Sequence, residues 1–86
     1  SPTVDSVIIQ FARKNLDASN EEIRDFFELV RACFKQRRKT IYNNLKEYVD
    51  DGNKATEILE KANIPANKRA QELTIDELKQ IHEVMK

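Results

Sequence analysis

The residues with the clearest chemical potential in this sequence are basic and lie close together near its middle. Lys35, Arg37, Arg38 and Lys39 place four positive charges within five residues, at the junction of two predicted helices. Positive charges this dense repel one another and are stabilised by an anionic partner. Because Lys and Arg neutralise phosphates and release their counterions, the block favours a nucleic-acid partner bound with salt-dependent affinity.

Predicted contacts extend into both helices that flank the block. Arg31 lies one turn before it, and Lys46 lies two turns after it. Amide side chains nearby could bond phosphate, sugar or base edges, and the Tyr42 ring could stack on an unpaired base. The predicted RNA-binding residues are Arg31, Lys35, Gln36, Arg37, Arg38, Lys39, Asn43 and Lys46. Among the amides, Gln36, Asn43 and Asn44 are predicted to be secondary contacts or caps at the helix junction.

The formal net charge is zero, but the charges are unevenly distributed. Residues 1–30 carry three basic and six acidic side chains, and residues 47–86 carry six basic and nine acidic ones. Residues 31–46 carry six basic side chains and no acidic one. A polyanion is therefore expected to meet the middle of the chain and not its ends.

The basic block also has interpretations that involve no RNA. A basic run is often a solvated helix junction, and a short one can be a nuclear localisation signal. Arg37 or Arg38 could instead form an ion pair that pins two helices together, and Arg69 could do the same. The candidate acidic partners are Glu28 and Glu72. If partly buried, such a pair would cost several kcal/mol to break on one side.

Other side chains capable of chemistry are too few for a catalytic or metal site. The single cysteine, Cys33, permits no intramolecular disulfide and is expected to be a buried, inert thiol. The single histidine, His82, excludes the usual His/Cys zinc clusters and is expected to be exposed or half-buried. The single glycine, Gly52, excludes glycine-rich phosphate loops. We predict no catalytic, metal-binding or cofactor-binding residue in this chain, and no cofactor.

Capping residues and apolar periodicity predict a helical bundle. Ser19 with Glu22, and Thr74 with Glu77, form capping boxes in front of amphipathic segments. The predicted helices cover residues 19–35, 38–49, 53–62 and 74–85, with a short helical turn within 66–72.

The connections and the core follow from the same pattern. Asp50, Asp51 and Gly52 predict a turn, with Gly52 as the stop signal of a helix, and not a metal site. The predicted core includes three aromatic residues of the first long helix, which are Phe26, Phe27 and Phe34.

The segment from Val4 to Phe11 predicts a strand, because it is rich in β-branched and aromatic residues and nearly continuous in apolar character. No second strand is predicted, and a lone strand cannot satisfy its own backbone groups. The chain also begins at Ser1 without Met. We therefore expect an all-α, four- to five-helix bundle behind an orphan strand left over from a missing domain.

Three segments resemble motifs of the KsgA-type ribosomal RNA adenine dimethyltransferases. Residues 2–6 (PTVDS) resemble the P-x-V-D-S segment at the last strand of that family's methyltransferase domain. Residues 34–45 (FKQRRKTIYNNL) resemble its F-x-Q-R-R-K-T-x-x-N-x-L signature, and residues 64–73 (IPANKRAQEL) resemble its I-x-x-x-x-R-A-E-x-L stretch. The chain departs from the family at Gln71, commonly Glu, and at Asn63, usually glycine.

The resemblance implies a two-domain enzyme. Its N-terminal Rossmann-like domain would bind S-adenosylmethionine and dimethylate N6 of two adjacent adenines near the 3′ end of small-subunit rRNA. Its C-terminal helical domain would help to dock the enzyme on the immature small subunit. This chain lacks the family's glycine-rich loop and its N-L/I-P-Y motif, so no catalytic residue is carried over and the chain alone is expected to be inactive.

Residues 1–18 are accordingly predicted to be the last strand and linker of a missing Rossmann-like methyltransferase domain, and residues 19–86 the C-terminal docking domain. The expected partner is small-subunit rRNA or the immature small subunit, bound by a cytoplasmic monomer without membrane contact. The alternative is a protein-interaction or regulatory module that packs on its own methyltransferase domain without touching RNA. A fragment with residual cofactor binding is disfavoured by the single glycine.

Overall fold

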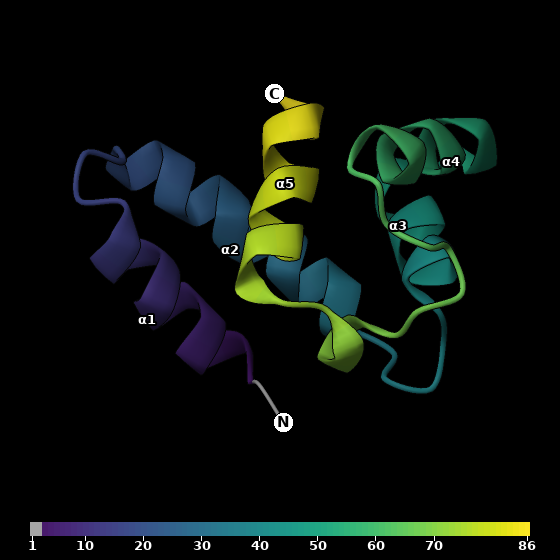
Figure 1. Cartoon of the computed structure of the whole chain (residues 1–86), viewed down its shortest axis with the longest axis horizontal. Helices are drawn as coiled ribbons and strands as arrows, with labels where there is room; N and C mark the ends of the chain where they lie inside the picture. Colours follow the sequence, from purple (N-terminus) through teal and green to yellow (C-terminus); the bar gives the residue numbers. More distant parts are fainter. Residues whose placement is uncertain (1–2) are drawn as a thin grey trace.

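The computed structural model describes residues 3–86 as a bundle of five α-helices and one short 3-10 helix (Figure 1). No strand occurs within this range. The helical fold class is therefore confirmed. The elements are α1 (Val4–Lys14), α2 (Asn20–Phe34), α3 (Ile41–Val49), α4 (Gly52–Lys61), η1 (Ala70–Glu72) and α5 (Ile75–Met85).

The predicted strand at residues 4–11 is wrong, because these residues form most of α1. Thr3 caps the helix by accepting from the Ser6 N–H at 3.2 Å, and Ser6 Oγ accepts from the Thr3 N–H at 3.0 Å. Val7 and Phe11 lie four residues apart and are both buried, so tertiary packing outweighs the β propensity of the segment. Pro2 lies outside the described residues. The division of the chain at residue 18 stays a prediction.

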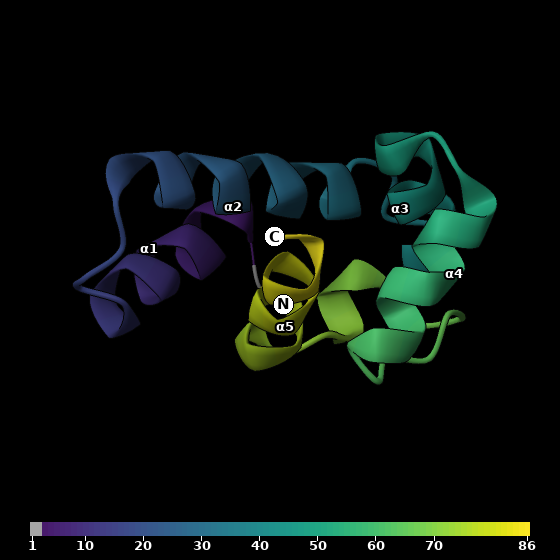
Figure 2. The ribbon, with the colours of Figure 1, turned by 90° about the horizontal axis from the view of Figure 1, so that it is seen from above.

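The core forms where α5 returns to the first two helices. Seen from above, α2 runs along one side of the molecule, with α1 and α5 lying beneath it (Figure 2). Phe11 of α1 stacks on Phe26 of α2 with ring centroids 4.0 Å apart. Leu78 and Ile81 of α5 are fully buried in the same cluster. α3 packs against the far end of α2, and α4 packs against α3 and α5, so the α2–α3 connection lies at a corner of the bundle.

Two helix boundaries differ from the prediction because of local capping. Helix α3 begins at Ile41 and not at residue 38, since Thr40 Oγ1 accepts from the Asn43 N–H. Gly52 begins α4 and does not end α3, because Asp50 adopts the left-handed conformation (φ 57°) and Asp51 caps the next helix. A short acidic side chain tolerates this conformation better than most residues.

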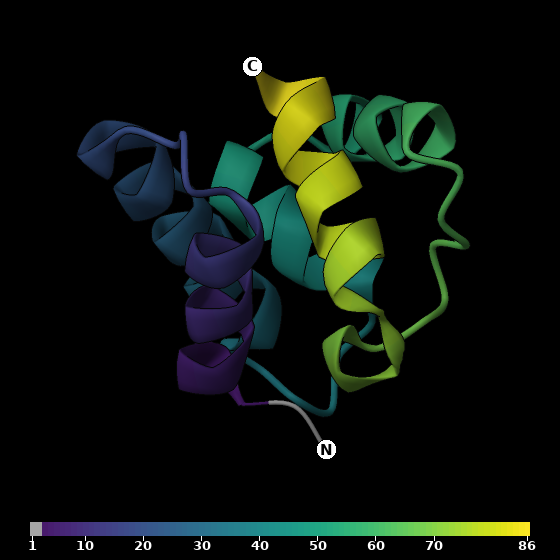
Figure 3. The same cartoon turned by 60° about the vertical axis from the view of Figure 1, so that its left-hand side comes forward.

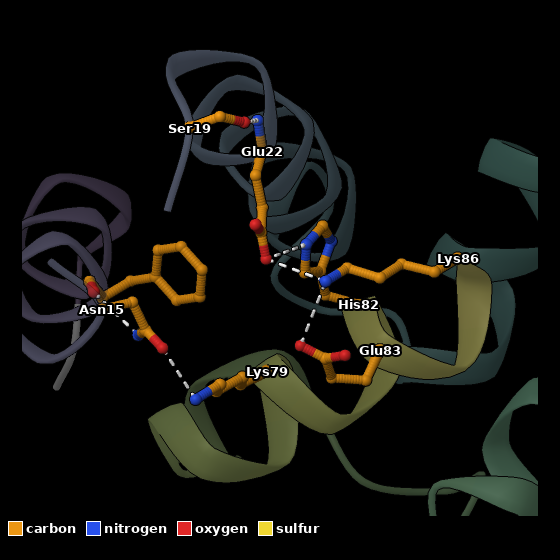
Figure 4. A network of polar contacts seen from close by, with 8 residues as sticks. Asn15, Ser19, Glu22, Lys79, His82, Glu83 and Lys86 are labelled. Atoms are coloured by element: carbon orange, nitrogen blue, oxygen red, sulfur yellow. Dashed lines mark hydrogen bonds and ion pairs between the residues drawn. The ribbon is translucent and has the colours of Figure 1, made fainter. Parts of the chain in front are cut away.

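His82 is buried, which corrects the expectation of an exposed or half-buried histidine. Its ring meets Phe11 and Phe26 edge-on, with centroids 6.1 and 5.5 Å away. Glu22 Oε1 lies 3.7 Å from His82 Nε2 and accepts a hydrogen bond of 2.9 Å from Lys86 Nζ (Figure 4). Of the predicted Ser19–Glu22 capping box, the structure contains the bond from the Glu22 N–H to Ser19 Oγ. The Glu22 carboxylate instead joins α2 to α5.

The Glu22–Lys86 contact predicts a pH dependence of stability. The hydrogen bond from Lys86 holds the pKa of Glu22 below its ordinary value of 4.5. Folding therefore favours the carboxylate, and this contribution is present above that value and is lost as the pH falls through the folded pKa. Between about pH 5 and about pH 3, we expect the free energy of unfolding to fall less in Glu22→Gln than in the parent. Urea titrations at several pH values measure it. Glu21→Gln is the matched control, since Glu21 shares the helix start but forms no ion pair with any of residues 3–86. An unchanged slope in Glu22→Gln would contradict the coupling.

Candidate nucleic-acid interface

A buried amide organises the loop that carries the basic block. The side chain of Asn44 is almost entirely buried, and its Nδ2 donates to the Gln36 carbonyl at 3.0 Å. The same carbonyl accepts from the Lys39 N–H at 3.0 Å, which closes a turn over residues 36–39. The backbone that carries the exposed cations is therefore hydrogen-bonded to a side chain buried in the core. Of the two predicted roles of Asn44, the structure places it at the helix junction.

The first N–H groups of α3 already have acceptors within the chain. The Ile41 N–H donates to the Lys68 carbonyl at 2.6 Å, and the Tyr42 N–H donates to the Ala66 carbonyl at 3.3 Å. The Asn43 N–H donates to Thr40 Oγ1 at 3.3 Å. A helix start with free N–H groups can bind an anion directly. Here those N–H groups are occupied, so the start of α3 does not bind a phosphate through them, and the exposed cations of the loop are the groups available to it.

The loop presents its polar side chains to solvent. Gln36, Arg37, Arg38 and Lys39 are exposed, as are Asn43 and Lys46 on α3. Within the described range, no ion pair engages Arg37, Arg38 or Lys39. The alternative in which Arg37 or Arg38 pairs with Glu28 or Glu72 is therefore wrong. The Glu72 carboxylate instead accepts from the Arg69 N–H at 2.9 Å, and Arg69 forms no ion pair with residues 3–86 either.

Two of the predicted cations already have partners. Lys35 Nζ lies 2.8 Å from Glu47 Oε1, and this hydrogen bond holds the pKa of Glu47 below its ordinary value. Both side chains are largely exposed, so the pair contributes little to stability. The Arg31 guanidinium lies over the Phe27 ring, 5.7 Å from its centroid. Phe27 is 37% exposed, which corrects its prediction as a core residue.

Residues 66–69 bring further positive charge to the same corner. The two backbone hydrogen bonds from Ile41 and Tyr42 place this segment beside the start of α3 (Figure 1). Arg69 is exposed and Lys68 is half-buried. In Figure 3, the α2–α3 loop and η1, which follows Arg69, lie toward the same end of the molecule. Neither cation is predicted from the sequence as an RNA contact, because both belong to a stretch with a net negative charge. The motif that contains Arg69 is the signal that could have identified them.

Acidic residues bound the interface on one side. A hollow of about 330 Å³ separates the basic loop from the start of α4. Positive and negative side chains both contribute to its walls, so the anion-attracting region ends at this hollow. Its lining residues are Lys39, Asn43, Lys46, Glu47, Asp50, Asp51 and Gly52.

Tyr42 supports the fold, and its stacking on a base stays a prediction. The residue is half-buried and packs against the core. A Cβ atom at Gly52 would lie 2.7 Å from the Tyr42 hydroxyl, which shows how closely α4 approaches this ring. Any larger residue at position 52 would therefore require the Tyr42 side chain to shift.

Other candidate chemistry does not gather near the basic loop. Burial raises the pKa of the Cys33 thiol to about 12, so it is not a nucleophile near neutral pH. In the described part of the chain, no three His, Cys, Asp or Glu side chains are placed to hold a metal ion. None of the helices between residues 3 and 86 has the length and apolar composition needed to cross a bilayer.

The buried amide of Asn44 predicts a difference between two adjacent asparagines. Asn44→Ala removes the bond to the Gln36 carbonyl and should lower the free energy of unfolding by about 1–3 kcal/mol. Asn43→Ala, the matched control at an exposed position, should change it by about 0.5 kcal/mol or less. Urea unfolding followed by circular dichroism measures both. Equal effects would show that Asn44 does not anchor the loop.

Comparison with known proteins places the chain in a family. The model of the ribosomal RNA adenine dimethylase family matches residues 1–86. The chain is 43% identical over 79 residues to the ribosomal RNA small subunit methyltransferase A of Mycoplasma capricolum, covering 88% of this chain and 29% of that protein. It is 36% identical over 92 residues to the protein of the same name from Staphylococcus aureus strain JH9, covering 99% of this chain and 30% of that protein. The chain thus spans less than a third of the length of these relatives. No solved structure matches it. On this evidence, the chain belongs to the ribosomal RNA adenine dimethylase family.

Proposed function

We propose that this chain is the RNA-docking helical module of an S-adenosylmethionine-dependent small-subunit rRNA adenine dimethyltransferase. Its partner is the small-subunit rRNA or the immature small subunit, and the contact is made through the α2–α3 loop. The relatives it matches carry the name ribosomal RNA small subunit methyltransferase A. The single glycine leaves no glycine-rich cofactor loop, so methyl transfer is assigned to another part of the enzyme.

One observation carries this proposal: three neighbouring cations are exposed, without ion pairs among the described residues, on a loop whose backbone is held by a buried amide. Arg37, Arg38 and Lys39 form no ion pair within residues 3–86, so their charge is available to phosphates. Because Asn44 fixes the turn beneath them, little backbone entropy is lost on binding. Arg side chains suit bidentate phosphate contacts, and Lys adds a flexible point charge.

The remaining predicted residues divide into two groups. Gln36, Asn43 and Lys46 are exposed and extend the surface along the loop and α3. Lys35 and Arg31 have intramolecular partners and contribute less to phosphate binding. Arg69, which is not one of the predicted contacts, extends the surface from the neighbouring segment. The interface is thus centred on residues 37–39, whose cations suit phosphate contacts.

A second role is favoured by exposed apolar side chains on a different element. Ile9 on α1 is 51% exposed, and Leu16 in the following loop is 86% exposed. Large apolar side chains in such positions are often covered by another domain. These two residues support packing against the methyltransferase domain of the same protein, in addition to RNA docking.

The RNA-docking proposal predicts a salt-dependent affinity. We expect the chain to bind a hairpin from the 3′ end of small-subunit rRNA, with log Kd changing linearly with log salt concentration. Replacing Arg37, Arg38 or Lys39 by Gln should weaken binding. If the replaced side chain binds a phosphate, the salt slope should also fall by about 1. Fluorescence anisotropy at several salt concentrations measures both quantities.

Arg24→Gln is the matched control, since Arg24 is exposed near the start of α2 and, like the three cations, forms no ion pair within residues 3–86. It should leave the slope unchanged. Affinity that is absent, or that does not vary with salt, would exclude phosphate binding by this loop. The same conclusion would follow if a folded Arg38→Glu or Lys39→Glu variant bound as tightly as the parent.

A further inference from the structure

A second surface of the molecule differs from the basic loop in both charge and composition. Tyr48 on α3 is 41% exposed and Phe27 on α2 is 37% exposed, so both aromatic rings are accessible to a partner. Acidic residues surround Tyr48 on the neighbouring turns of α2 and α3. We call this region the Tyr48 surface, made of Asp25, Glu28, Ala32, Glu47 and Tyr48.

Two hollows lie in line along α2, and Tyr48 borders both of them. The first has a volume of about 180 Å³ and opens between α2, α3 and α5. The second, of about 220 Å³, lies between α2 and α3. The first is lined by Asp25, Leu29, Tyr48, His82, Met85 and Lys86, and the second by Ala32, Lys35, Asn44, Glu47 and Tyr48.

The Tyr48 surface has hydrogen-bond acceptors that lack donors. Asp25 and Glu28 form no ion pair with any of residues 3–86. Asp25 lines the first hollow together with Tyr48, and Glu28 lies one turn further along α2. Partial burial, followed by the nearby charges of Glu28 and Asp25, raises the pKa of Tyr48. In the second hollow, Asn44 Oδ1 is buried without a hydrogen-bond partner. A buried acceptor without a donor is costly, so a ligand that supplies one is favoured.

We propose that the Tyr48 surface binds an arginine side chain from a basic segment of a partner protein. The guanidinium would lie over the Tyr48 ring, beside the carboxylates of Asp25 and Glu28, which form no ion pair within residues 3–86. Such a planar cation stacks on aromatic rings and carries several donors in a fixed geometry, which a Lys ammonium does not. Arg31 over Phe27 is an intramolecular example of this contact on the same helix.

RNA does not suit this surface. Its unpaired carboxylates repel phosphates, whereas the α2–α3 loop attracts them. The two lysines that line the hollows already have partners: Lys35 pairs with Glu47, and Lys86 pairs with Glu22 and Glu83. The partner is therefore a protein, and this surface adjoins the one proposed for RNA at the Lys35–Glu47 pair.

The test is a titration of the ¹⁵N-labelled chain with a capped Arg-Gly-Arg-Gly-Arg peptide, followed by amide chemical shifts. We expect the shifts to be centred on Asp25, Leu29, Asn44 and Tyr48. The same peptide with citrulline in place of arginine, which is isosteric and neutral, should produce no such shifts. Tyr48→Leu should weaken binding about threefold, the effect expected for one exposed cation–π interaction. The lysine analogue should bind more weakly than the arginine peptide.

The matched charge controls are Glu28→Gln, which should weaken binding, and Glu60→Gln on α4, which should not. Both positions are exposed, and neither Glu forms an ion pair within the described residues. Shifts spread evenly over all acidic residues would overturn the proposal, as would unchanged affinity in a folded Tyr48→Leu variant. Equal binding of the lysine analogue would also overturn it. RNA affinity of the Tyr48→Leu and Glu28→Gln variants should stay unchanged or rise, so the two proposals fail independently.

Discussion

The hydrogen bond from the buried Asn44 amide to the Gln36 carbonyl is the interaction on which the functional corner of this molecule depends. It joins α3, through a side chain in the core, to a loop whose own polar side chains face solvent. The loop turn, the start of α3 at Ile41 and the attachment of residues 66–69 occur within a few residues of this bond. The residues of this short motif thus have two different roles. The backbone is anchored by Thr40, Ile41 and Asn44. The side chains exposed to a partner are those of Arg37, Arg38 and Lys39.

Much of the helical fold can be predicted from local sequence, and the exceptions have physical causes. Helices α2 and α5 are recognisable because their capping residues and apolar spacing agree with each other. The prediction fails at α1 because Val and Ile favour strands locally, whereas the burial of Val7 and Phe11 on one helical face is a tertiary effect. It fails at Gly52 because Asp50, and not the glycine, adopts the left-handed conformation that ends α3, and Asp51 caps α4.

The candidate site shows the same division between local and long-range information. Exposed cations in residues 35–39 are predictable from charge density alone. Their partners are not, because Lys35 pairs with a residue twelve positions away and Arg31 lies on an aromatic ring that periodicity assigns to the core. The contribution of Lys68 and Arg69 depends on backbone hydrogen bonds that cross more than twenty residues of sequence. Contacts of this kind need the tertiary structure.

The separation of the basic loop from the acidic Tyr48 surface has a consequence for the approach to a partner. The formal net charge of the chain is zero, so a distant polyanion exerts almost no net force on it. The charges are nevertheless segregated, so the molecule has an electric dipole and experiences a torque in the field of the polyanion. Beyond about one Debye length, roughly 8 Å at physiological ionic strength, this torque is screened. The domain would thus be rotated into its docking orientation only during the last stage of an encounter, with electrostatics aligning a molecule that diffusion has already delivered.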